Sequence, residues 1–289
     1  MSAFYTKFLS MINQVQMNRR QFVQKTAIGS AALTFGLSAA TLVGAADPYR
    51  GLKMGLASIS FRDFTLDQGI VMTKELGVRG LALRQAHLPM TSTPAELKEA
   101  AKKIKDAGLE LLGAGVINMK QEDDVRSAFA YAKDAGVPTI VCSPEPELLD
   151  AVEKCAVEYK IRVAIHNHGP GDKIYRSPLD ALKVVKDRHE LMGLCLDVGH
   201  TARLGENPVE VLQKCSQRLY DFHMKDVTEA TANGKPCIVG QGVIDVPAVL
   251  KSLVNMKFPY HVALEYETDR TAPMPGMKAS FEYMRSVLA

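Results

Sequence analysis

Acidic and imidazole side chains end several apolar runs in the second half of the chain. His166 ends the run that begins near residue 162, and Asp197 ends the run that begins near residue 192. His223 and Glu265 hold equivalent positions in the next two runs. Two imidazoles and two carboxylates neutralise a divalent ion, and this ligand set suits Mn²⁺, Co²⁺, Fe²⁺ or Zn²⁺ better than Mg²⁺. We therefore expect one divalent metal ion held by these four side chains. Mn²⁺ is the leading expectation, and the ligand set itself leaves the identity of the ion open.

Further polar residues lie close to these candidate ligands in the sequence. His168 and Lys225 each follow a candidate ligand by two positions, and alternate residues of a strand share one face. His200 lies in the loop after the run that ends at Asp197, and Arg84 and His87 follow a run much earlier in the chain. Such groups suit contacts to a polar small molecule. The candidate substrate contacts are Arg84, His87, His168, His200 and Lys225.

A single histidine near a strand is more often a structural residue that hydrogen bonds satisfy, and we assign His189 and His261 to that class. The structural explanation does not extend to the whole set of polar residues at these strand ends. Burying several imidazoles, two carboxylates and an ammonium near one axis costs several kcal/mol for each group that lacks a partner. We therefore predict that a metal ion or a polar ligand binds among them.

The elements that must position these residues alternate between short apolar runs and amphipathic stretches, which is typical of β/α units around a parallel sheet. The expected strands cover residues 53–60, 79–83, 110–116, 139–142, 162–166, 192–198, 219–223 and 261–266. The expected helices cover residues 67–76, 94–107, 122–135, 147–159, 178–188, 208–215, 247–255 and 276–287. This pattern predicts an α/β fold with a single (β/α)8 TIM barrel over residues 47–289. The carboxyl ends of its strands form one mouth, where active sites of such barrels lie.

Glycine and proline mark the joints between these elements. Gly77, Gly108 and Gly136 each follow an expected helix, as C-terminal caps do, and Pro94 and Pro178 stand where helices begin. An open doubly wound sheet is the alternative, but it requires a glycine-rich phosphate loop after the first strand, and none is present there. A Gly-Gln-Gly segment at 240–242 lacks the spacing of a dinucleotide fingerprint, and we interpret it as a tight loop.

The first 46 residues have the composition of an export signal. Arg19 and Arg20 precede Phe22 and Lys25, and an uncharged run rich in Ala, Gly, Ser and Leu follows up to Ala45. Paired arginines before a weakly hydrophobic segment are typical of the twin-arginine route, so we expect the twin-arginine export machinery as a partner and a periplasmic or otherwise exported protein. An uncleaved membrane anchor is the alternative. In either case only this segment would contact the membrane.

The charge and the cysteines limit the class of protein further. The formal charge of +3 becomes −1 without residues 1–46, because that segment holds four basic side chains and no acidic one. A nearly neutral domain of 47–289 offers no electrostatic surface for nucleic acid. The five cysteines contain no CxxC pair, so they indicate neither a zinc knuckle nor a disulfide framework. We expect Cys142, Cys155 and Cys195 to behave as small core residues.

The polar strand ends resemble those of the xylose isomerase-like TIM-barrel superfamily, which includes sugar isomerases, epimerases and inosose dehydratases. The resemblance covers residues 47–289. It is strongest in IHNHG (165–169), LDVGH (196–200), HMKD (223–226), VGQGVID (239–245) and LEYE (264–267). It implies metal ligands at Asp197, His223 and Glu265, and substrate contacts at His200 and Lys225. Epimerases of the family usually have a glutamate where this chain has His166, which disfavours simple epimerisation by two carboxylates.

The resemblance implies proton abstraction beside a carbonyl of a sugar or ketosugar, with the metal stabilising the enediolate. Glu265 is the expected base, His168 or His200 the second proton carrier, and Lys225 the partner of the developing oxyanion charge. Reprotonation would give an isomer or epimer. Loss of a leaving group would instead make the protein a lyase or dehydratase on 3-keto-glycosides or inosose-like ketones. The alternative to an enzyme is an exported sugar-binding protein without catalytic activity.

Overall fold

The computed structural model describes residues 47–289, which form one compact unit. The predicted export signal at 1–46 lies outside the described residues. Within the described part, no helix is both long and apolar enough to span a bilayer.

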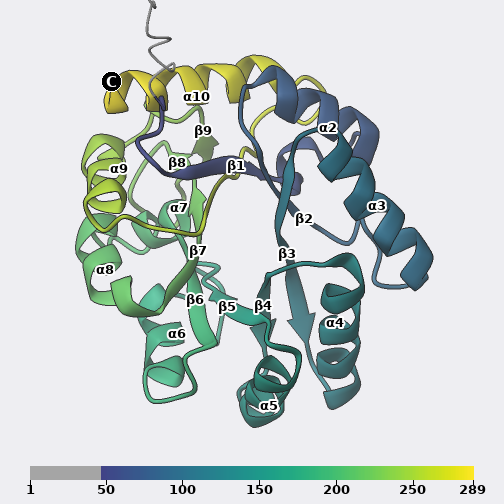
Figure 1. Cartoon of the computed structure of the whole chain (residues 1–289). Coiled ribbons are helices and arrows are strands. Elements are labelled where there is room, and N and C mark those ends of the chain that lie inside the picture. Colours follow the sequence, from purple (N-terminus) through teal and green to yellow (C-terminus); the bar gives the residue numbers. More distant parts are fainter. Residues whose placement is uncertain (1–46) are drawn as a thin grey trace, which may run out of the picture. The chain divides into compact units, whose positions relative to one another are not determined.

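Eight parallel strands close into a barrel in the order β1-β10-β7-β6-β5-β4-β3-β2. They are β1 (Lys53–Ala57), β2 (Gly80–Leu83), β3 (Glu110–Met119), β4 (Thr139–Pro144), β5 (Arg162–His166), β6 (Met192–Asp197), β7 (Leu219–Met224) and β10 (His261–Leu264). Closure comes from β1, which pairs with both β2 and β10. The predicted TIM barrel is therefore confirmed, and the open sheet is wrong (Figure 1).

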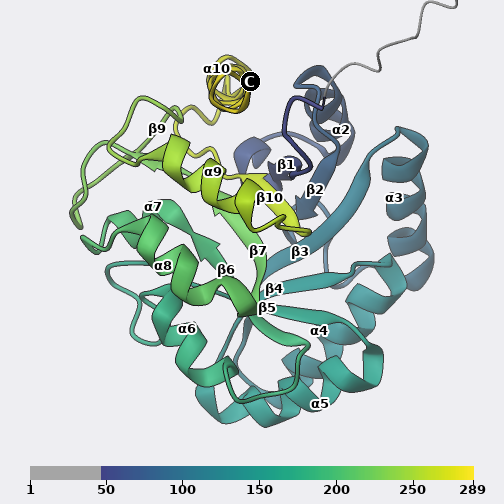
Figure 2. The same cartoon turned by 60° about the vertical axis from the view of Figure 1, so that its left-hand side comes forward.

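Helices surround the barrel and follow its strands in chain order (Figures 1 and 2). The main ones are α2 (Leu66–Glu75), α3 (Pro94–Asp106), α4 (Glu122–Ala135), α5 (Leu149–Tyr159), α6 (Pro178–Val185), α8 (Pro208–Cys215), α9 (Val246–Asn255) and α10 (Met274–Leu288). Their apolar faces pack on the strands, whose outward side chains are apolar and almost all buried. Each predicted helix is present within a few residues of its expected bounds.

The ends of the helices follow from local chemistry. Thr93 and Ser177 form capping boxes at the starts of α3 and α6, and a proline follows each of them as the first helical residue. Gly136 ends α4 with a φ of 70°, a left-handed conformation that glycine adopts without steric cost. These signals keep the β/α connections short, so the strand ends are held at defined positions.

The structure departs from the expected elements near the mouth of the barrel. The first strand ends at Ala57 and continues as the short helix η2 (Ser58–Phe61). The Ser60 hydroxyl donates to the Leu264 carbonyl (3.0 Å) and accepts from the Tyr266 N–H (2.9 Å), so a side chain replaces the strand ladder there. A one-turn helix, α7 (Val198–Ala202), follows β6 directly.

A small hairpin of β8 (Asp226–Val227) and β9 (Pro236–Cys237) interrupts the β/α alternation after β7. Asp226 organises the segment that follows, because its carboxylate accepts the N–H groups of Gly240 (2.9 Å), Gly242 (3.0 Å) and Ile244 (3.2 Å). The Gly-Gln-Gly segment is thus a loop folded around a buried carboxylate, as expected from its spacing.

Candidate metal centre

Four strand ends bring the four predicted metal ligands together at the mouth of the barrel. His166 and Asp197 are the last residues of β5 and β6, His223 is the penultimate residue of β7, and Glu265 directly follows β10. One ligand atom from each lies within 4.8 Å of all the others. All four side chains are buried, with Glu265 the most exposed at 7%.

The distances between ligand atoms fit a single ion. His166 Nε2 lies 3.0 Å from His223 Nδ1 and 3.9 Å from Asp197 Oδ2. His223 Nδ1 lies 2.5 Å from Glu265 Oε2. Bonds of about 2.0–2.2 Å to a divalent ion would place neighbouring ligand atoms roughly 3–3.5 Å apart, which this range brackets. Asp197 Oδ2 is buried without a well-formed hydrogen bond within residues 47–289, although the Lys225 ammonium forms an ion pair with it at 3.3 Å.

Asp197 is held from both sides. Its Oδ1 accepts the His200 N–H at 2.8 Å as the cap of α7, and its own N–H donates to Asn167 Oδ1 at 2.8 Å. Asn167 also donates to the Asp197 carbonyl at 3.3 Å. Asn167 was not among the predicted site residues, although it stands between the two histidines of the IHNHG segment. These contacts leave the Asp197 side chain one orientation, with Oδ2 toward the other ligands.

Lys225 lies beside the ligands and is only 2% exposed. Its Nζ is 3.3 Å from Asp197 Oδ2, 3.0 Å from Glu265 Oε1 and 2.6 Å from Glu267 Oε1. Glu267 was not among the predicted site residues, and it lies two positions after Glu265, beyond the end of β10. Three carboxylates therefore surround one ammonium at the edge of the cluster.

His168 and His200 flank the cluster on its more open side, with side-chain exposures of 32% and 18%. The His168 ring centre is 4.7 Å from that of His166, and His200 Nε2 is 3.9 Å from Asp197 Oδ2. His168 Nδ1 also lies 3.2 Å from Asp172 Oδ2. Both predicted contacts are thus placed where a molecule bound at the cluster would meet them.

Arg84 and His87 lie after β2, apart from these contacts. His87 is 8% exposed, its Nδ1 is 3.0 Å from Ser58 Oγ, and its Nε2 is 3.1 Å from the Phe64 carbonyl. Protein atoms occupy both ring nitrogens, so the geometry favours a structural role for His87 over the predicted substrate contact. Arg84 is half-buried, and its N–H donates to Ser58 Oγ at 2.8 Å.

The family model of xylose isomerase-like TIM barrels matches residues 71–287. The chain belongs to this family. An inosose dehydratase of Bacillus thuringiensis is 24% identical over 74% of this chain and 77% of its own length. One of Clostridium botulinum is 27% identical, but the match spans 44% of this chain and only 47% of that relative.

Solved structures share the barrel at lower identity. A protein called IOLI, with a bound zinc atom, has a TM-score of 0.69 at 16% identity, covering 82% of this chain and 98% of that one. A 3-keto-D-glucoside 4-epimerase of E. coli has a TM-score of 0.67 at 16% identity, covering 81% and 99%. At this identity the likeness concerns the fold.

Burial and the neighbouring charges determine the protonation states of the candidate metal ligands. Burial lowers the pKa of His166 well below its usual value, and the nearby His223 lowers it further, so His166 is a neutral imidazole. Burial also lowers the pKa of His223, but Glu265 and Asp221 outweigh it and raise that pKa to about 9. Burial raises the pKa of Glu265, yet Lys225 and His223 bring it well below the usual range. Without an ion, His223 therefore holds a proton between itself and Glu265.

A second set of potential ligands, His166, Cys195 and His223, shares both histidines with the first. Sequence reasoning placed Cys195 in the apolar core. The thiol is indeed fully buried, but its Sγ lies 3.7 Å from Asp221 Oδ1. Both residues precede a site residue by two positions, and that spacing could have revealed them.

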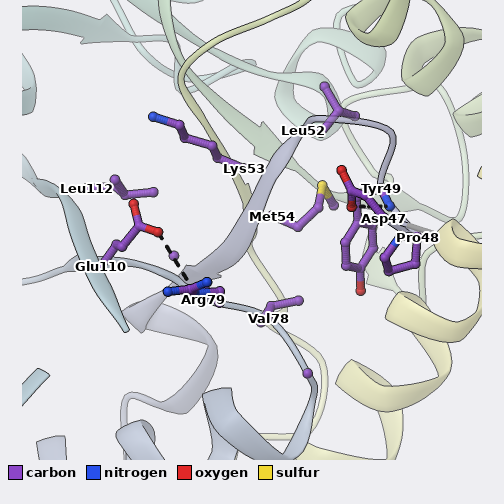
Figure 3. Close-up of a pocket in the computed structure, with 12 residues that line it drawn as sticks. Asp47, Pro48, Tyr49, Leu52, Lys53, Met54, Val78, Arg79, Glu110 and Leu112 are labelled. Atoms are coloured by element: carbon purple, nitrogen blue, oxygen red, sulfur yellow. Dashed lines mark hydrogen bonds and ion pairs between the residues drawn. The ribbon is translucent and has the colours of Figure 1, made fainter. Parts of the chain in front are cut away.

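A cavity of about 290 Å³ lies at the opposite end of the barrel, where β1, β2 and β3 begin (Figure 3). Tyr49, Met54 and Val78 line it, and Arg79 and Glu110 form an ion pair at 4.0 Å on its wall. This basal cavity contains none of the residues of the metal cluster. Chemistry in TIM barrels takes place at the carboxyl ends of the strands, so we do not assign the reaction to this cavity.

Proposed function

We propose that this protein is a metal-dependent enzyme that removes a proton beside a carbonyl of a sugar or ketosugar. The observation that carries the proposal is the buried group of His166, Asp197, His223 and Glu265 at the mouth of a barrel of this family. The relatives named inosose dehydratase support an enzyme that acts on a sugar-like substrate.

The four side chains would hold one divalent ion, for which we propose Mn²⁺, with Co²⁺, Fe²⁺ and Zn²⁺ as alternatives. When bound, the ion supplies Lewis acidity that favours negative charge on a substrate oxygen. The bound zinc of the IOLI structure supports metal binding by a protein of this fold. Buried carboxylates and neutral His166 are the protein's contribution to holding the ion.

Proton transfer falls to groups that face the open side of the cluster. Glu265 is ionised and is the proposed base for the substrate carbon. Burial lowers the pKa values of His168 and His200, so both rings are neutral near pH 7 and either can act as the second proton carrier. Lys225, held by three carboxylates, is a fixed positive charge near the position where an oxyanion would develop.

Two outcomes share this first step. Return of the proton to the same or the neighbouring carbon gives an isomer or epimer, which is the leading proposal. Loss of a group from the adjacent carbon gives a lyase or dehydratase, and the inosose dehydratase relatives favour this second candidate. His166 also favours it, because it replaces the carboxylate that a two-carboxylate epimerisation would use.

The test is incubation of the Mn²⁺-loaded protein with ketohexoses, an inosose and a 3-keto-glucoside in D₂O. Deuterium in a rearranged sugar would establish the isomerase or epimerase, whereas water loss or aglycone release would establish the lyase. Tight sugar binding with neither reaction would favour the non-catalytic sugar-binding protein.

Glu265→Gln provides the matched variant, because the amide keeps the shape of the side chain and loses its basicity. We expect turnover to fall by at least about 100-fold, the lower end of what a positioned base contributes. Metal content must be measured alongside, since Glu265 is also a proposed ligand. Turnover near the original rate in a metal-loaded variant would rule out Glu265 as the base.

We also propose export by the twin-arginine route for residues 1–46, with a periplasmic or otherwise exported location for the barrel. The composition of that segment supports this. Sequencing the N-terminus of the mature protein tests it: a start near residue 47 is expected, and an intact segment would favour the anchor.

A further inference from the structure

Three neighbouring strands place polar side chains in a layer inside the barrel, one step below the metal cluster. Asp221 of β7 pairs in register with Cys195 of β6 on one side and with His261 of β10 on the other. Asp221 and Cys195 are fully buried and His261 is 2% exposed. Branched apolar side chains usually fill the layers of a TIM barrel, so a polar layer here requires an explanation.

Several atoms of this layer lack partners. Asp221 Oδ2 and both ring nitrogens of His261 make no hydrogen bond within residues 47–289. A buried polar group left in this state costs about 1–3 kcal/mol. The earlier interpretation of His261 as a histidine satisfied by the protein is therefore wrong, because nothing in the described chain satisfies it.

Glycines of β2 and β3 lie directly against these atoms, so no side chain at these two positions can supply a hydrogen-bond partner. A Cβ added at Gly113 would lie 3.5 Å from Asp221 Oδ2, and one at Gly80 would lie 2.8 Å from His261 Nε2. Gly80 also lines the basal cavity.

The other oxygen of Asp221 faces the metal cluster. Asp221 Oδ1 lies 3.6 Å from His223 Nε2, while His223 Nδ1 faces His166 and Glu265. The two nitrogens of this ring thus have separate partners, a carboxylate behind and the ligand group in front. A histidine that binds a metal commonly donates its second N–H to such a carboxylate, which fixes the tautomer and the ring orientation.

We propose that Asp221 is the positioning residue for His223 and that the polar layer exists to hold it. The carboxylate keeps the proton of His223 on Nε2, so Nδ1 is free for the ion. Cys195 contacts the same oxygen as His223. The inference deepens the proposed function and rests on it for the identity of the bound metal.

The test is Asp221→Asn in the full-length protein, which preserves shape and removes the charge. With Co²⁺ as the probe, we expect affinity in a chelator competition to fall by about 10–100-fold and the visible Co²⁺ spectrum to change. Asp226→Asn is the matched control, because this carboxylate is equally buried but faces the N–H groups of residues 240–244. It should leave the Co²⁺ affinity of the folded protein unchanged.

Cys195→Ala separates the proposal from direct ligation by the thiol. We expect a small change in affinity and no thiolate-to-cobalt charge-transfer band in the original protein. Such a band, lost in Cys195→Ala, would overturn the positioning scheme in favour of a cysteine ligand. Unchanged affinity and spectrum in Asp221→Asn would overturn it as well.

Nitrogen NMR of the His223 ring in the metal-free protein distinguishes this inference from the proposed function. We expect the Nε2–H signal to move in Asp221→Asn and to stay in Asp226→Asn. A protein that binds no Co²⁺ would defeat the proposed function, and the ring signal would still decide the role of Asp221: no shift in Asp221→Asn overturns it.

Discussion

When no ion is bound, Lys225 supplies the positive charge that offsets the three carboxylates around it. Replacing it by methionine leaves Asp197, Glu265 and Glu267 without their shared partner in a buried setting. Removing one partner of a buried ion pair destabilises by about 3–5 kcal/mol, so we expect a loss of this size in metal-free Lys225→Met. A bound ion replaces part of that charge and should reduce the loss.

Thermal unfolding with and without Mn²⁺ measures this difference. Lys183→Met is a suitable control, since its ammonium pairs with Asp180 on the surface at 3.0 Å and is 72% exposed. We expect little change there. Equal losses in Lys225→Met with and without the ion would contradict the idea that lysine and ion share the same carboxylates.

His223 links metal binding to pH. Its pKa of about 9 means that the ring is protonated at pH 7, and an ion can bind Nδ1 only after that proton leaves. We expect release of about one proton per ion at pH 7, with affinity rising roughly tenfold per pH unit until the pH approaches 9. Calorimetry in buffers of different ionisation enthalpy counts the protons; a count near zero would contradict the assignment of His223 as a ligand.

At the scale of elements, Asp226 holds the segment between β9 and α9. Its carboxylate accepts N–H groups at Gly240, Gly242 and Ile244, whereas an amide offers only one oxygen. For Asp226→Asn we expect a loss of about 1–3 kcal/mol. Hydrogen exchange should become faster mainly in residues 238–244. Faster exchange spread evenly over the barrel would instead indicate that Asp226 supports the whole fold.

The sequence predicted the β/α elements well because each strand is an apolar run between helices with clear caps, as with Thr93 before α3. The hairpin of β8 and β9 escaped prediction, since each strand has two residues and the segment between them is polar. Alternation predicted that Lys225 shares a face with His223, and the structure has Lys225 Nζ 3.0 Å from Glu265 Oε1. The same rule applied to Asp221, two positions before His223 in β7, would have added that residue.

The remaining site features depend on contacts between segments distant in the sequence. His87 looks like a free polar residue in the sequence, but Ser58 and the carbonyl of Phe64 occupy its ring nitrogens. His261 looks structural, yet its partners are missing from the described chain. The periodicity of the sequence predicts the face of an element on which a side chain lies. It does not predict which atoms from other segments contact that side chain.

At the scale of the whole molecule, buried histidines should make the metal-free protein sensitive to acid. Their folded pKa values lie below the usual value of about 6.5, so the unfolded chain binds protons that the folded protein does not. The free energy of unfolding should therefore fall as the pH drops below about 6.5. Burial is the first cause of the lowered pKa in each case: His87, His166, His168, His200 and His261.

Asp221 and His223 have raised pKa values, so they change the free energy of unfolding with pH in the opposite direction. Burial raises the pKa of Asp221 to about 6, so its contribution to stability is lost as the pH rises through 6. The contribution of His223 is present at low pH and is lost as the pH rises through about 9. Denaturant titrations of the metal-free protein from pH 4 to pH 9 should show a maximum near about pH 6.5. A steady rise in stability down to pH 4 would contradict the five lowered values.

Lys225 and the proton on His223 already balance the charges of Asp197 and Glu265 in the absence of an ion. The barrel can therefore finish folding first and acquire its metal afterwards. Affinity for divalent metals follows an order that ranks Mn²⁺ below Zn²⁺ and Cu²⁺, so a site filled during synthesis would take whichever ion competes best in that compartment. Under the proposed export, a folded chain that carries its own internal counter-ion would take its metal from the compartment in which it arrives.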